Sequence, residues 1–228
     1  MSQLPQPDPL DAVVPFSQLT ARAVAWLWMY HLGFGKLAML DGDPDQGKSF
    51  VALDLCARLS TGRPMPDGSP GPGVVPSLIL QSEDSAEDTT RPRLEALGAD
   101  LDQVHTWREL YGGRGILLPT DLELLHGALV KTGARFVVLD PIMAFLDRSV
   151  LANSDQGVRG ALAPMAHLLD HCSAAALMVR HLNKQGGTHA IYRGGGSIGL
   201  LTAKHPKRRS SPHSKTPCRC VHYFPEMR

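Results

Sequence analysis

The sequence is poor in several features that mark specialised protein classes. Its 228 residues include only four cysteines, and aromatic residues make up 6% of the chain. Four cysteines are too few for a disulfide scaffold in a chain of this length, so we expect reduced thiols. No apolar run reaches the roughly 20 residues of a membrane-spanning helix, and prolines and acids occupy the start, where a signal peptide needs basic and apolar residues. We therefore expect a cytoplasmic protein without a membrane segment.

Internal repeats and a strong overall charge are also missing. The 23 Lys and Arg residues nearly balance the 22 Asp and Glu residues, and 43% of the chain is apolar. This composition excludes collagen, coiled coil and general disorder, and the length fits one domain. The charge is uneven, because residues 204–228 hold seven Lys or Arg and one acid. We divide the chain into an N-terminal extension (1–23), a domain (24–203) and a basic tail (204–228) that we expect to lack regular structure.

Short apolar runs alternate with helical patterns along the domain, which is typical of an α/β fold with a mainly parallel sheet. The expected strands are 37–41, 74–81, 135–140 and 174–180. The expected helices are 49–60, 90–97, 120–132 and 156–172. Thr120 and Glu123 predict a capping box at the start of the third helix. Residues 62–73 contain too much Pro and Gly for a helix or strand, and the signals between 104 and 118 are weak.

The strongest motif is GDPDQGKS at residues 42–49, which matches G-x-x-x-x-G-K-S/T between an expected strand and an expected helix. Backbone N–H groups of such a loop wrap phosphates, Lys48 neutralises β- and γ-phosphate oxygens, and Ser49 binds Mg²⁺. Asp45 stands where these loops often have glycine. Asp tolerates unusual backbone angles, but its carboxylate repels a triphosphate and would weaken binding. The predicted nucleotide site is Gly42, Asp43, Pro44, Asp45, Gln46, Gly47, Lys48, Ser49 and Phe50.

Polar residues end three further apolar strands. Asp140 closes FVVLD, and we predict that it holds the water shell of the metal. Glu83 follows LILQ, and we predict that it is the base that activates water, with Asp84 in a capping or supporting role. His181 follows AALMVR and is predicted to sense the γ-phosphate. Each has a plain structural alternative, because buried strands can end in Asp, acids can cap helices, and a lone His is usually structural.

In their order along the chain, the motifs GDPDQGKS, LILQSED, FVVLDP, VRHLNK and YRGGGS resemble the RecA-like ATPases of the plasmid RepA helicase type, which are often grouped with the AAA-type ATPases of mobile elements. The resemblance covers about residues 24–203. It implies a three-layer RecA-like P-loop NTPase fold and a ring-forming ATPase, such as a hexamer. ATP and Mg²⁺ would be its cofactors and single-stranded DNA its partner, in replication of a plasmid, phage or mobile element. His181 would pass its signal to the 183–196 loop, which faces DNA in related rings.

The chain departs from this family after about Leu200. Family members continue into a helix whose arginine reaches the ATP of the neighbouring subunit, and then into further strands. Here the pattern ends, which predicts a truncated or altered copy that binds ATP better than it hydrolyses it. Cys218 and Cys220, with His213 and His222, have no standard zinc-site spacing, so we expect an unstructured tail there.

Several functions remain open at this point. The leading one is an ATPase of the DNA-helicase class, and the main alternative is an ATP-dependent DNA-binding regulatory or assembly module that does not unwind DNA. A GTPase needs an acid in its base-reading motif, but residues 183–186 read NKQG. A small-molecule kinase would need an arginine-rich lid, and the sequence has no arginine cluster between the motifs.

Overall fold

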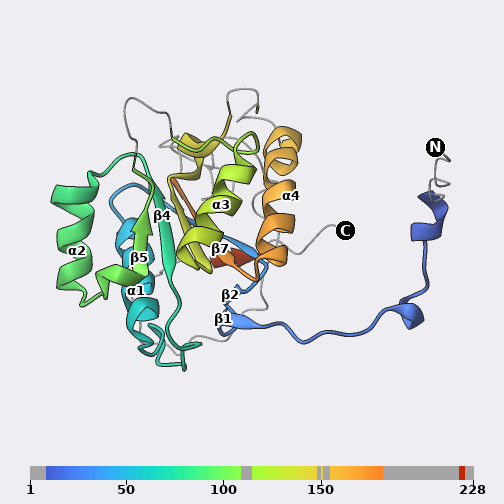
Figure 1. Cartoon of the computed structure of the whole chain (residues 1–228), viewed down its shortest axis with the longest axis horizontal. Coiled ribbons are helices and arrows are strands. Elements are labelled where there is room, and N and C mark those ends of the chain that lie inside the picture. Colours follow the sequence, from blue (N-terminus) through green and yellow to red (C-terminus); the bar gives the residue numbers. More distant parts are fainter. Residues whose placement is uncertain (1–8, 109–114, 148–149, 151–154, 182–220, 224–228) are drawn as a thin grey trace.

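A six-stranded sheet forms the centre of the protein in the computed structural model, which describes residues 9–108, 115–147, 150, 155–181 and 221–223 (Figure 1). The strand order is β5-β4-β6-β7-β3-β8. The first five strands run parallel, whereas β8 runs antiparallel to β3. The strands are β3 (Leu37–Gly42), β4 (Ser77–Gln81), β5 (Val104–Thr106), β6 (Phe136–Asp140), β7 (Ala175–His181) and β8 (Val221–Tyr223), with a separate two-stranded sheet of β1 (Trp26–Trp28) and β2 (Leu32–Gly33).

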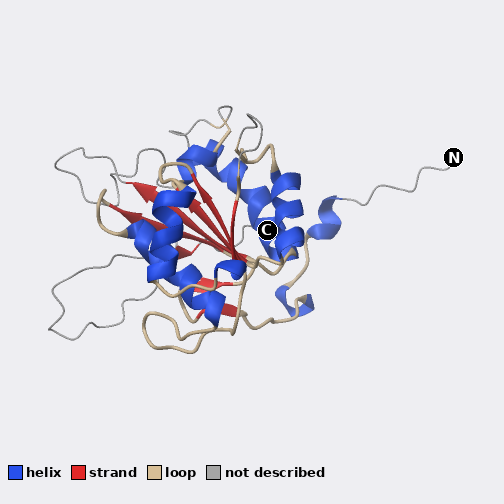
Figure 2. Cartoon of the chain, turned by 60° about the vertical axis from the view of Figure 1, so that its left-hand side comes forward, coloured by secondary structure: helices blue, strands red, loops and turns tan. Residues whose placement is uncertain are grey.

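Helices cover both faces of the sheet and give three layers (Figure 2). Apolar residues of α1 and α2 pack in one buried cluster, and those of α3 and α4 pack in the cluster on the opposite face. The main helices are α1 (Lys48–Thr61), α2 (Arg91–Ala96), α3 (Leu122–Thr132) and α4 (Asp155–His171). The single turns are η1 (Pro9–Ala12), η2 (Phe16–Gln18), η3 (Ala86–Thr90), η4 (Leu101–Gln103) and η5 (Ile142–Phe145). The α/β fold with a mainly parallel sheet is confirmed.

The apolar runs in the sequence follow from this layering. Successive side chains of a strand point to opposite faces, so a strand covered on both sides needs apolar residues throughout. In β3, Leu37 and Met39 join the cluster under α3 and α4, whereas Ala38 and Leu40 join the cluster under α1. All four are buried. The run LAML therefore identifies β3 as an interior strand.

Two element starts differ from the sequence prediction. The strand expected from residue 74 begins at Ser77, because Pro76 has no N–H to donate to a neighbouring strand. The capping box at Thr120 is wrong. The Thr120 hydroxyl donates to the Asp147 carboxylate at 2.6 Å. The helix α3 begins at Leu122, and Asp121, the residue before it, makes no capping hydrogen bond with its side chain. A distant partner has replaced the local one.

Three residues of the basic tail form a strand. We expected residues 204–228 to lack regular structure, and this is wrong for Val221–Tyr223, which pair with Ala38, Met39 and Leu40 of β3. A β-branched and an aromatic residue favour extended backbone, and β8 pairs the side of β3 that β7 leaves open. The other tail residues lie outside the described part of the chain.

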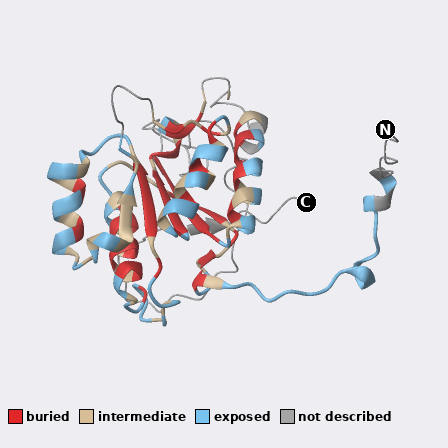
Figure 3. Cartoon of the chain, viewed as in Figure 1, coloured by how far each residue is buried: buried red, intermediate tan, exposed pale blue. Residues whose placement is uncertain are grey.

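The N-terminal segment extends away from the sheet (Figures 1 and 3). Residues 12–25 are all exposed, in contrast to the buried strands that follow. Their apolar side chains include Phe16, which is 90% exposed. Within the described residues, the helices are too short or too polar for any of them to span a bilayer.

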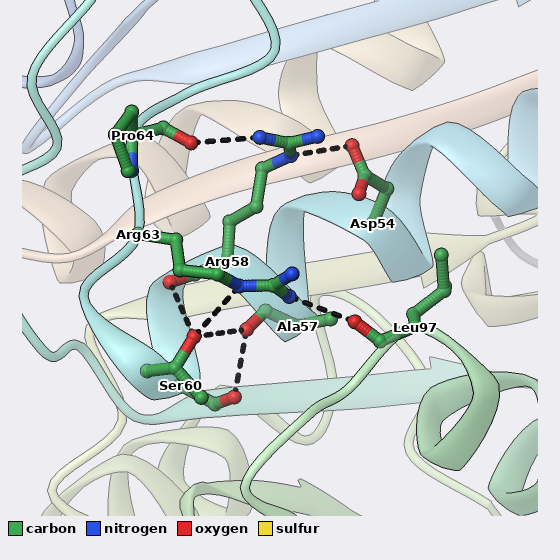
Figure 4. A network of polar contacts seen from close by, with 8 residues as sticks. Asp54, Ala57, Arg58, Ser60, Arg63, Pro64 and Leu97 are labelled. Carbon is green, nitrogen blue, oxygen red and sulfur yellow. Dashed lines mark hydrogen bonds and ion pairs between the residues drawn. The ribbon is translucent and has the colours of Figure 1, made fainter. Parts of the chain in front are cut away.

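A network of polar contacts stabilises the C-terminal end of α1 (Figure 4). Arg58 donates through Nε to the Asp54 carboxylate at 2.7 Å and through Nη1 to the Pro64 carbonyl at 2.8 Å. Arg63 reaches the Leu97 carbonyl, just after α2, at 2.8 Å. These contacts tie α1 to the loop that follows it and to α2. The opposite end of α1 is therefore presented to the carboxyl edge of the sheet on an anchored helix.

Candidate active site

The parallel pairing brings the predicted site residues to one edge of the sheet. Gly42 at the end of β3 lies opposite His181 at the end of β7. Gln81 at the end of β4 lies opposite Asp140 at the end of β6. Because these four strands are neighbours in the sheet, the segments that follow them share one edge, where open α/β sheets bind ligands. The sequence placed these polar residues at strand ends, and the register shows which of those ends are neighbours.

The loop between β3 and α1 has the backbone of an anion site. Gly47, the N-cap of α1, adopts a left-handed conformation with φ of 74°, and Asp45 adopts one with φ of 62°. Asp45 therefore adopts the unusual backbone angle that the sequence analysis expected it to tolerate. The first N–H of α1 to bond back to the loop is that of Val51, to the Gly47 carbonyl at 3.0 Å. By helix geometry, the N–H groups before Val51 point toward the hollow of the loop, where they can bind an anion.

Lys48 is folded back over this loop. Its Nζ donates to the Gly42 carbonyl at 3.0 Å and to the Asp43 carbonyl at 2.6 Å, and the residue is 6% exposed. Burial lowers the side-chain pKa of Lys48 below its usual value, and the charges of Asp140, Asp43, Asp41 and Asp45 act in the opposite direction. An anion bound in the loop would relieve the cost of burying this ammonium group.

A small cavity next to the loop brings three predicted residues together. Ser49, Glu83 and Asp140 all line it, with Asp84 at the same site. A hydroxyl and a carboxylate fit Mg²⁺, which prefers oxygen ligands, keeps several waters and takes few ligands from protein when it binds phosphates. The part of the chain that is described holds no cluster of three or more His, Cys, Asp or Glu suited to a metal. Among the oxygen donors that line this cavity, Ser49 and Asp140 are the two that the sequence predicts to hold Mg²⁺.

A larger cavity of about 430 Å³ adjoins the first one. Trp107 and Phe145 line it, and it shares Gln81 and Asp84 with the smaller cavity. None of the residues that we predict to bind phosphate, metal or the attacking water lines it. The smaller cavity beside the loop is therefore the candidate active site.

His181 is placed only by its backbone. It is the last residue of β7 and pairs with Gly42, so the strand ends beside the loop as expected. The position of its side chain and the whole 183–196 loop lie outside the described residues. Its predicted role in sensing the γ-phosphate stays a prediction.

The comparison with protein families agrees with this geometry. Residues 4–187 match the family AAA_25, which is described as an AAA domain. The chain belongs to this family of RecA-like P-loop ATPases. The three-layer α/β fold is the fold expected of this family. The narrower resemblance to the RepA helicase type is not confirmed.

Two curated relatives of the AAA_25 chain carry the same name. DNA repair protein RadA of Bacillus subtilis (strain 168) and that of Halalkalibacterium halodurans are each 25% identical to it over 154 residues. The alignments cover 67% of this chain but only 29% of each relative. The chain thus corresponds to less than a third of the length of these proteins.

An aromatic ring and an arginine flank the phosphate loop of the AAA_25 domain. Phe50 in the first turn of α1 is 51% exposed, and the Arg93 guanidinium lies 5.3 Å from its ring centroid. Arg93 Nη1 also contacts the Asp84 carboxylate at 2.6 Å. The sequence placed Phe50 in the nucleotide site but gave Arg93 no role. The helix expected at residues 90–97 could have suggested a role for Arg93, because it begins soon after Glu83 and Asp84.

A second ion pair missed by the sequence joins β3 to β7. Arg180 binds the carboxylate of Asp41 through two hydrogen bonds of 2.8 Å each. The two residues are directly opposite each other in neighbouring strands. The only available signal was an opposite charge near the end of each of two apolar strands of the AAA_25 domain.

Proposed function

We propose that this chain binds ATP with Mg²⁺ at the carboxyl edge of the sheet and hydrolyses it to ADP, with transfer of the γ-phosphoryl group to water. The observation that carries this proposal is the convergence of Lys48, Ser49, Glu83 and Asp140 on one loop and the cavity beside it. A loop and helix N-terminus that bind phosphate, two oxygen donors for a metal and a carboxylate for water are the parts that phosphoryl transfer to water requires. The AAA_25 family match supports the same conclusion.

Each residue has a distinct task in this proposal. The Lys48 ammonium exchanges its contacts with the Gly42 and Asp43 carbonyls for oxygens of the β- and γ-phosphates. Ser49 and Asp140 hold Mg²⁺, which neutralises charge on the same phosphates. Glu83 orients a water molecule and accepts its proton, and such a base contributes about 10²- to 10⁴-fold to a rate.

Phe50 and Arg93 offer a surface for the base of ATP. In a phosphate loop, the N–H groups at the start of the helix bind the α- and β-phosphates. The ribose and base continue from the α-phosphate, so they leave the loop near the first turn of α1, where the Phe50 ring is exposed. Aromatic and guanidinium planes stack with nucleobases. We therefore place adenine against Phe50.

Titration with ATP and with inorganic tripolyphosphate separates the two parts of the site. Lys48→Ala should weaken both ligands by at least about 30-fold, because charge-assisted hydrogen bonds to phosphate contribute about 2 kcal/mol. Phe50→Ala should weaken ATP by about tenfold or more through lost stacking and leave tripolyphosphate unchanged. Isothermal titration in the presence of Mg²⁺ measures both affinities.

Phe16→Ala is the matched control for that titration, since it removes the same side chain from an exposed position in the N-terminal segment. It should change neither affinity. Equal ATP affinity for wild type and Lys48→Ala would overturn the assignment of the loop. Unchanged ATP affinity in Phe50→Ala would overturn only the placement of the base.

The two neighbouring carboxylates, Glu83 and Asp84, should differ in their effect on hydrolysis. Glu83→Gln removes the base without removing a phosphate contact, so ATP should still bind while hydrolysis falls at least about 10²-fold. Asp84→Asn should have a much smaller effect, because Asp84 binds Arg93. Release of inorganic phosphate, with ATP affinity measured in parallel, tests this. The reverse order of the two losses would show that Asp84 is the base.

We further propose that ATP turnover is coupled to single-stranded DNA by a ring of several chains, as in helicases that replicate plasmids, phages or other mobile elements. The DNA repair proteins among the relatives support a DNA partner, and the basic residues of 204–228 provide charge for phosphate contacts. The alternative is an ATP-dependent regulatory or assembly module that binds DNA without unwinding it. A copy that binds ATP but hydrolyses it poorly is a second alternative, and slow phosphate release by wild type would favour it.

Strand displacement measured beside ATP hydrolysis separates these alternatives. We expect single-stranded DNA to bind more tightly in the presence of ATP and Mg²⁺, and a forked duplex to be unwound by wild type but not by Glu83→Gln. Fluorescence anisotropy and a fluorescent fork assay measure the two effects. Binding without displacement would favour the module, and DNA binding that is absent or indifferent to ATP would contradict the DNA proposal.

A further inference from the structure

The ion pair between Asp41 and Arg180 is buried at the entrance to the phosphate loop. The Arg180 side chain is 1% exposed and the Asp41 side chain 9% exposed. Both guanidinium–carboxylate hydrogen bonds measure 2.8 Å, which is close to ideal for a bidentate pair. Asp41 immediately precedes Gly42, whose carbonyl accepts a hydrogen bond from Lys48. The pair therefore lies where β3 passes into the loop.

Stability alone explains this pair poorly. Removing two charges from water is costly, and a buried ion pair compensates only when its remaining donors are also satisfied. Arg180 Nη1 is buried and has no hydrogen-bond partner within the described part of the chain. An apolar pair at these positions would extend the cluster formed by Met39 and Met178 on the same face of the sheet. The charges at this position call for a different explanation.

The surroundings of Lys48 provide that explanation. Four carboxylates, those of Asp140, Asp43, Asp41 and Asp45, act on its charge. A triphosphate that enters this loop meets the same negative charges. A guanidinium held by two hydrogen bonds on Asp41 offsets part of one of them, and it competes with the Lys48 ammonium for the Asp41 carboxylate.

We propose that Arg180 is a positioning residue that neutralises Asp41 and so keeps Lys48 and the loop receptive to ATP. This inference rests on the proposed ATP site. Arg180 acts through Asp41 and does not touch the nucleotide itself. Because the next residue is His181, the same arginine also fixes the end of β7 beside the loop.

If the ion pair only held β3 and β7 together, as a clamp, its loss would have a different effect from loss of charge cancellation. The two effects can be separated because one residue of the pair is negative and the other is positive. Asp41→Asn and Arg180→Gln break the same ion pair and keep similar side-chain volumes. The first removes a negative charge from the site and the second removes a positive one. A clamp is lost equally in both variants, whereas charge cancellation is lost only in Arg180→Gln.

Titration of the variants with ATP and ADP in the presence of Mg²⁺ tests the proposal. Arg180→Gln should bind ATP at least about tenfold more weakly, the size expected for one uncancelled charge several ångströms from phosphate in a partly screened site. The loss should be smaller for ADP, which carries less charge. Asp41→Asn should bind ATP at least as tightly as wild type. The double variant should return to within about threefold of wild type, because the uncancelled carboxylate is then gone. Asp41→Asn is the variant that decides against a clamp, since loss of a clamp would weaken ATP binding there too.

Arg135→Gln is the matched control. It removes the same positive charge just before β6, at the opposite edge of the sheet, and should leave ATP affinity unchanged. Equal weakening of ATP binding by Asp41→Asn and Arg180→Gln would overturn the proposal. If Arg180→Gln does not fold, Asp41→Asn and the double variant still decide, since weak ATP binding by both would overturn it. Lys48→Ala, titrated alongside, shows independently whether ATP uses the loop at all.

Discussion

Parallel hydrogen bonding between β4, β6, β7 and β3 is the constraint on which the candidate site depends. Parallel strands end at the same edge, and the register sets Gln81 opposite Asp140 and Gly42 opposite His181. Each residue proposed to act on the phosphates, the metal or the attacking water lies within a few positions of such a strand end or in the first turn of α1. A shift of two residues in any strand would move its polar end by about 7 Å, which would separate the groups around the phosphates.

The site balances opposing charges at close quarters. Burial makes the positive charge of Lys48 costly, and the surrounding carboxylates and two backbone carbonyls offset part of that cost. Asp45 adopts the left-handed backbone that glycine would adopt more easily, and it adds a further negative charge. Arg180 binds the Asp41 carboxylate at the end of β3 and offsets part of its charge. The loop is therefore suited to a ligand that brings both phosphate and Mg²⁺, because Mg²⁺ offsets the repulsion from the acids.

The sequence predicted the parts of this site that depend on local pattern. GDPDQGKS between an apolar strand and a helix identified β3, α1 and the loop, and FVVLD identified β6 and Asp140. Interactions between distant residues were not predictable in this way. Asp41 and Arg180 are 139 residues apart and meet only because β3 and β7 are neighbours. The contact of Arg93 with Phe50 depends on how α2 packs on α1, and Thr120 turned to Asp147 instead of its local capping partner.

Binding of ATP and Mg²⁺ at the carboxyl edge is tested most directly by hydrogen exchange of the full chain with and without the nucleotide. Exchange should slow for peptides covering residues 42–50 and the segment after β4 that contains Glu83. It should stay unchanged in the exposed residues 12–25 and on addition of ATP to Lys48→Ala. Protection confined to other regions, such as the larger cavity beside Trp107, or no protection at saturating ATP would contradict the proposed site.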